Sequence, residues 1–200
     1  MASDLYLSLW FPRPRMEHLP QKIVQVMRQL PTPRVHAATV FPLGWQESPI
    51  FQRIYGKEST GPVSPEVAVA EATATLHEDH AYEFELTWEL WLPETDGILD
   101  PVWRREERPV RVLGFGPEFD EGYYEQNGHV RVDLGLDTPF LCEDVPLDET
   151  GQRHLQQNIQ QLVDFTRAVD AHCGVETRLL WTESEDNIAA NLIARLQKLN

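Results

Sequence analysis

The segment His77-Glu78-Asp79-His80 places two imidazoles three residues apart, with two carboxylates between them. Imidazole nitrogens and carboxylate oxygens are donor atoms with which proteins hold zinc or manganese. If the strands that follow form an antiparallel meander, His129 and Asp120 lie at the same end of the sheet as this segment. The predicted metal ligands are therefore His77, His80, His129 and Asp120. Such a set would suit a metal-dependent hydrolase.

The same segment also has a simpler interpretation, as a polar turn between a helix and a strand. Surface loops are commonly this polar, and a histidine such as His77 is favourable at the C-terminus of a helix. The sequence contains no Gly-x-Ser-x-Gly elbow, phosphate-binding loop, dinucleotide-binding fingerprint or His-Glu-x-x-His motif. No cofactor is indicated, and the absence of these signatures favours a protein without catalytic activity.

A second group of residues consists of aromatic rings and guanidinium groups in or beside acidic loops. These types supply much of the binding energy at protein interfaces, because they offer large contacts for little lost conformational entropy. The predicted partner-binding residues are Trp91, Trp103, Arg104, Arg105, Tyr123 and Tyr124. Four apolar residues are predicted to point outward from their strands: Trp91, Leu113, Phe115 and Leu180. Either they form an exposed apolar patch or another segment covers them, and segment 93–109 is the candidate cover.

The distribution of charge limits the possible partners. The net charge is −15, and residues 58–150 alone carry −18, against +4 for residues 1–57 and −1 for residues 151–200. An excess of carboxylates repels phosphate backbones and anionic lipid surfaces. We therefore expect neither nucleic acid nor a membrane as a partner, and we expect a protein partner of basic character.

The expected compartment is the cytoplasm. No apolar run approaches the roughly 20 residues that span a bilayer, and the first residues lack the pattern of a secretory signal. Cys142 and Cys173 have no Cys-x-x-Cys spacing, so a zinc ribbon is excluded and two reduced thiols are the simpler interpretation.

Hydrophobic periodicity predicts the elements that position these residues. The clearest alternation runs through residues 81–92, with Tyr82, Phe84 and Leu86 on one face and Glu83 and Glu85 on the other. Strands are predicted at 5–11, 35–41, 50–55, 81–92, 110–115, 130–136 and 175–181. Helices are predicted at 16–30, 64–76, 152–173 and 184–199.

This order of elements predicts an α+β fold, a mostly antiparallel sheet of about seven strands with about four helices packed on one face. The 200 residues are expected to form a single globular domain over 1–200. The sequence predicts a non-catalytic protein-binding module, physically of the kind of a bacterial adaptor or immunity protein. The alternative is the metal-dependent hydrolase, and the oligomeric state is left open.

Overall fold

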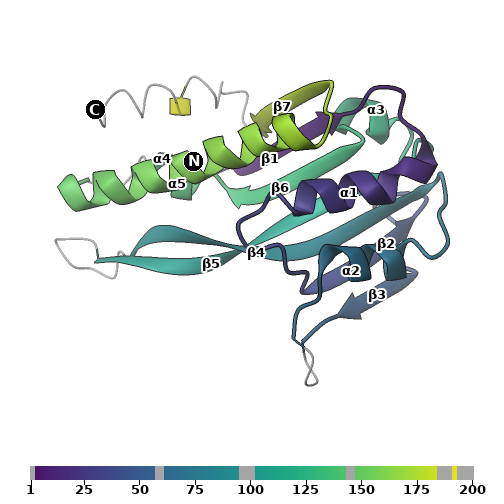
Figure 1. The fold of residues 1–200 in the computed structure, drawn as a ribbon, viewed down its shortest axis with the longest axis horizontal. Helices are drawn as coiled ribbons and strands as arrows, with labels where there is room; N and C mark the ends of the chain where they lie inside the picture. Colours follow the sequence, from purple (N-terminus) through teal and green to yellow (C-terminus); the bar gives the residue numbers. More distant parts are fainter. Residues whose placement is uncertain (1–2, 57–60, 95–101, 143–146, 184–190, 193–200) are drawn as a thin grey trace.

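A seven-stranded antiparallel sheet forms the centre of the computed structural model (Figure 1), which describes residues 3–56, 61–94, 102–142, 147–183 and 191–192. Its order is β3-β2-β4-β5-β6-β1-β7. The strands are β1 Asp4–Trp10, β2 Ala37–Pro42, β3 Phe51–Ile54, β4 His80–Glu94, β5 Val102–Phe115, β6 Val130–Leu136 and β7 Thr177–Thr182. The helices are η1 Met16–His18, α1 Leu19–Met27, α2 Pro65–Ala72, α3 Tyr123–Asn127, α4 Thr138–Leu141 and α5 Glu149–His172. The predicted α+β class is confirmed.

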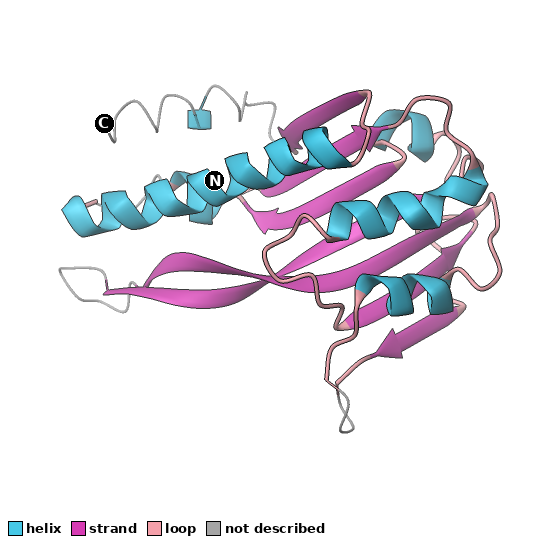
Figure 2. Cartoon of the chain, in the orientation of Figure 1, coloured by secondary structure: helices cyan, strands magenta, loops and turns pink. Residues whose placement is uncertain are grey.

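The longer helices α1, α2 and α5 lie on one face of the sheet (Figure 2), and the main core lies between these layers. Of the residues of β4 that the alternation predicted to face inward, Tyr82, Phe84, Leu86, Trp88 and Leu90 are buried, whereas Leu92 is half-buried. Helix α1 approaches β5 closely at Gly114, where a Cβ atom would lie 2.4 Å from Ile23 Cδ1. A glycine at that point therefore allows the helix to pack directly on the strand.

Strands β4 and β5 extend as a pair beyond the rest of the sheet (Figure 1). We call this extension, residues 86–94 and 102–110, the arm. The two strands pair from Ala81–Phe115 to Glu94–Val102, whereas β2 accompanies β4 only to Glu85. Segment 93–109, between two predicted strands, was expected to be a loop. This expectation is wrong for residues 93–94, which end β4, and for residues 102–109, which belong to β5; residues 95–101 lie outside the described part of the chain. Charged residues on both phases of this strand concealed its alternation.

Helix α5 supports the arm through the fully buried Asn158. The Trp91 N–H donates to Asn158 Oδ1 at 2.9 Å, and Asn158 Nδ2 donates to the carbonyl oxygens of Trp91 and Pro139, each at 2.8 Å. Since β2 has ended before this point of β4, the amide of Asn158 takes the place of a neighbouring strand.

Several boundaries differ from those expected. Helix α5 begins at Glu149 rather than 152, because the Asp148 carboxylate accepts a hydrogen bond from Gly151 N at 2.6 Å. The short helices α3 and α4 were not predicted. The helix expected at 184–199 lies outside the described residues except for Asn191 and Leu192. Cys142 and Cys173 are buried and free of a disulfide. Within the described chain, no helix combines the length and apolar character required to cross a membrane.

We predict that Asn158→Ala lowers the free energy of unfolding by about 2–4 kcal/mol, because it leaves backbone groups of Trp91 and Pro139 without partners. Denaturant-induced unfolding measures the loss. The matched control is Gln160→Ala on the exposed side of the same helix, where the amide bonds only the Asp164 carboxylate among the described residues. Equal small losses in both variants would contradict the role assigned to Asn158.

Candidate functional site

Three loops meet at the end of the sheet where β4 begins, near α3 in Figure 1. We call residues 43–50, 73–79 and 116–128 the loop end. Backbone hydrogen bonds join these loops directly: Leu43 N donates to Asp79 O at 2.7 Å, Asp120 N to Leu43 O at 2.9 Å and Glu118 N to Glu78 O at 2.8 Å. Each loop therefore holds the others in place.

The backbone of the loop end is tightly constrained. A Cβ atom on Gly116 would lie 2.2 Å from the carbonyl oxygen of Glu78, so the loops meet closely only with glycine at that position. Leu43, Asp120 and Glu121 adopt positive φ angles of 60°, 48° and 41°. Such conformations cost roughly 1–3 kcal/mol each in residues with side chains, and they persist where surrounding contacts fix the backbone.

An aromatic cluster packs beneath the loop end on the sheet face opposite the long helices. Its buried members are Ala81, Leu113, Phe115, Phe119 and Tyr124, with Phe41, Trp45 and Tyr123 packed against them. The Trp45 ring meets Phe119 edge-on, with centroids 5.1 Å apart. These loop residues cover Leu113 and Phe115, the role that was proposed for segment 93–109. The outward direction predicted for Leu180 is wrong, because its pairing with Leu7 places it on the helix-covered face.

The two tyrosines predicted to bind a partner have different environments. Tyr124 is 8% exposed and stacks on His129 at a centroid distance of 4.3 Å. Burial raises the pKa of its hydroxyl to about 12. Tyr123 is half-buried, and its ring centroid lies 5.7 Å from that of Trp45. Its hydroxyl accepts a hydrogen bond from Arg131. Tyr123 therefore contributes to the surface of the loop end, and Tyr124 supports it from beneath.

The four predicted partner-binding residues of the arm all have partners within the chain. Trp91 stacks on His154 of α5 at 3.8 Å, and the guanidinium of Arg105 lies 5.0 Å above the same ring. Trp103 packs against α5 where a Cβ on Gly151 would be 3.0 Å from its ring. The arginines form ion pairs along the arm, Arg105 with Glu89 at 3.0 Å and Arg104 with Glu94 at 2.9 Å. The two tryptophans hold the arm on the helix, and the ion pairs join the two strands of the arm to each other.

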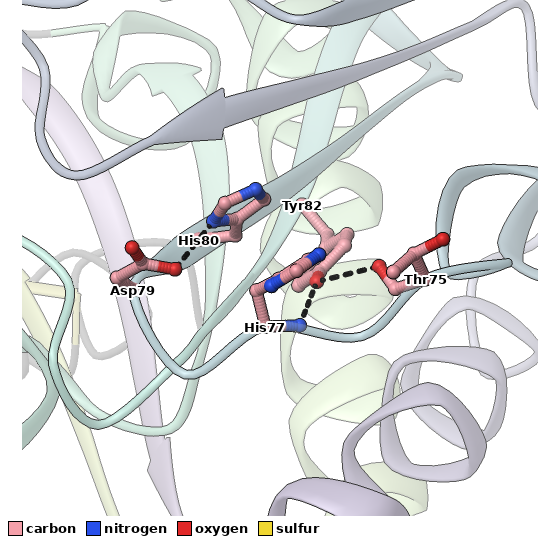
Figure 3. Close-up of polar contacts among 5 residues, drawn as sticks. All are labelled: Thr75, His77, Asp79, His80 and Tyr82. Atoms are coloured by element: carbon pink, nitrogen blue, oxygen red, sulfur yellow. Dashed lines mark hydrogen bonds and ion pairs between the residues drawn. The ribbon is translucent and has the colours of Figure 1, made fainter.

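The structure brings together His77 and His80, and it adds Asp79 to them (Figure 3). The possible ligand atoms of these three residues all lie within 4.8 Å of one another. His80 Nδ1 is 2.8 Å from Asp79 Oδ1, and the two imidazoles stack with centroids 4.5 Å apart. His77 is exposed, whereas His80 is 8% exposed.

His129 and Asp120, the other two predicted ligands, do not join this group. His129 Nδ1 accepts a hydrogen bond from Phe11 N at 3.0 Å, and its ring packs on Tyr124. Asp120 is exposed beside Gly44. The strand order brings the backbone of these residues to one end of the sheet, but the side chain of His129 turns toward β1.

The surface of the loop end is acidic. Its exposed carboxylates are Glu47, Glu78, Glu118, Asp120, Glu121 and Glu125, and Asp79 is half-exposed. Among the ion pairs of the described residues, only Asp79–His80 involves one of them. Leu43 is 58% exposed. Its backbone N–H bonds the carbonyl oxygen of Asp79, and its carbonyl oxygen accepts from the backbone N–H of Asp120. An exposed apolar residue is thus bonded through its backbone to two aspartates of this surface, whose carboxylates have no arginine or lysine partner in the described chain.

Comparison of the chain with protein-family models, with curated proteins and with solved structures finds no match. Function is therefore inferred from the loop end and the arm themselves.

We predict that His129 makes folding stability depend on pH. Burial lowers the pKa of its imidazole to about 4, against about 6.5 in an unfolded chain. Because the unfolded state takes up the proton first, the contribution of His129 is full above pH 6.5 and is lost as the pH falls toward 4. Its size is up to about 3 kcal/mol.

Denaturant-induced unfolding of the wild type and of His129→Gln between pH 7 and pH 4 measures this contribution. We expect the stability advantage of the wild type to shrink over that range. An advantage that stayed constant with pH would show that His129 takes up its proton equally in both states.

Proposed function

We propose that the protein is a non-catalytic protein-binding module that recognises a basic partner through the loop end. One observation carries the proposal. Leu43 is exposed, its backbone is constrained, and it belongs to an acidic surface whose carboxylates have no arginine or lysine partners in the described chain. A surface with apolar contact area and charge of one sign is suited to a protein partner of the opposite charge.

The charge would act before contact. Clustered carboxylates create a negative potential that speeds the encounter with a basic partner and disfavours acidic ones. Arg104 and Arg105 do not compensate these carboxylates, because both pair with carboxylates of the arm itself. In the described chain, the carboxylates of the loop end are left without arginine or lysine partners.

The fixed backbone would favour binding. Ordering loops on association costs free energy, so a surface already held by the bonds of Leu43 and Glu118 loses less entropy when a partner binds. The aromatic cluster beneath it supports Trp45 and Tyr123, which are half-buried and so remain partly exposed to a partner. We propose these two rings, with Leu43, as the apolar contacts.

The arm takes a supporting role in this proposal. Trp91 and Trp103 are half-buried against α5, and their neighbouring arginines are paired. The metal-dependent hydrolase is the second candidate, because His77, Asp79 and His80 come together. It takes second place because His129 and Asp120, which it also invoked, lie outside that group.

Selection from a random peptide library on the immobilised full chain tests the proposal. We expect the selected peptides to be rich in lysine and arginine around an aliphatic residue, and their affinity to fall as salt is raised. Neutral or acidic peptides with salt-independent binding would contradict it.

Paired variants locate the contact. We predict that Leu43→Asn weakens binding of the selected peptides at least about 10-fold, and asparagine tolerates the positive φ at this position. The control is Leu179→Asn, which removes a leucine of similar exposure, 52%, from β7. Equal affinities of the two variants would place the binding surface elsewhere.

A further inference from the structure

The turn that carries His77, Asp79 and His80 is anchored residue by residue. His77 N donates to the hydroxyl of Tyr82 at 2.9 Å, and that hydroxyl donates to Thr75 O at 3.4 Å (Figure 3). The Tyr82 side chain is fully buried, so it ties the turn to the core. The carbonyl oxygens of Glu78, Asp79 and His80 accept from Glu118, Leu43 and Gly116, at 2.7–2.8 Å. The three side chains therefore start from fixed backbone positions.

The donor atoms are close to the spacing that a metal ion requires. Four ligands about 2.1 Å from a tetrahedral ion lie about 3.4 Å from one another. The atoms of this group lie within 4.8 Å of one another, and His80 Nδ1 and Asp79 Oδ1 are already 2.8 Å apart. Because His77 is exposed, small rotations of its side chain can bring its imidazole nitrogen to the same point.

Two members of the group, His77 and His80, also line a groove, together with Thr75, Phe51 and Glu71. The volume of this groove, about 310 Å³, leaves room for a further ligand. Glu71 does not complete the ligand set, because its carboxylate accepts from the Tyr55 hydroxyl at 2.8 Å and pairs with Arg53 at 3.2 Å. Three protein ligands and one open position result.

We propose that His77, Asp79 and His80 bind one Zn²⁺ ion, with water or an incoming donor in the fourth position facing the groove. The ion takes the place of the proton between His80 Nδ1 and Asp79 Oδ1, and the His80 proton then resides on Nε2. Two imidazoles and one carboxylate favour zinc over magnesium or calcium, which prefer oxygen ligands. The site shares Asp79 with the acidic surface of the loop end, but its ability to bind a metal ion does not depend on peptide binding there.

Titration of the metal-free full-length chain with ZnCl₂ by isothermal calorimetry tests the site. We predict one equivalent bound by the wild type, affinity reduced at least about 10-fold in His77→Ala, and no heat of binding with MgCl₂. The exposed position of His77 makes its replacement compatible with folding, which circular dichroism checks.

The matched control is His18→Ala, which removes another exposed histidine beside a carboxylate; His18 Nε2 lies 3.6 Å from Glu17 Oε1. It should bind Zn²⁺ as the wild type does. The proposal is overturned if the wild type binds no zinc, if both variants lose affinity equally, or if Mg²⁺ binds as well as Zn²⁺. Because the readout is metal binding alone, failure of the peptide selection leaves this result interpretable.

Discussion

The continuous pairing of β4 with β5 is the constraint on which both the loop end and the arm depend. It begins at Ala81–Phe115 beside the loop end and continues to Glu94–Val102 on the arm. At the first end, it fixes His80 next to Gly116, so that the turns before β4 and after β5 must pack on each other. At the other end, it carries Trp91 and Trp103 to α5, where Asn158 bonds the free edge of β4.

The sheet has two differently built faces, and the alternation of strands explains both. Inward residues of β4 enter the core beneath the long helices, while Leu113 and Phe115 of β5 point to the other side. No helix of seven or more residues covers them in the described chain, so the loop carrying Trp45 and the turn carrying Phe119 do so. Covering an apolar patch with loops brings their acidic residues to one place, which is why the aromatic cluster and the carboxylates coincide.

The sequence predicted elements whose periodicity follows from burial on one face. The strand at 81–92 and the helix at 152–173 are of this kind, and their inward apolar residues are buried as expected, apart from the half-buried Leu92. Residues 102–109 gave no such signal, since an arm with little burial leaves charges on both phases of the strand. For the candidate site, the predicted strand order correctly placed residues 80 and 129 near one end of the sheet. Periodicity does not predict the direction in which a histidine side chain at the end of a strand points.

Leu43 and Trp45 were missed because their importance arises from contacts between loops distant in sequence; the neighbouring Gly44 indicates only a turn.

The net charge of −15 acquires a different meaning once the ion pairs are known. On the arm, Glu89 and Glu94 are paired with arginines, whereas among the described residues no carboxylate of the loop end is paired with an arginine or lysine. The proposed metal ion would add positive charge beside Leu43, since Asp79 belongs to both regions. Bound Zn²⁺ would thus weaken long-range attraction of a basic partner while fixing the turn that shapes its contact surface. These effects oppose each other, and by linkage a basic partner would alter zinc affinity by the same factor as zinc alters the affinity for that partner.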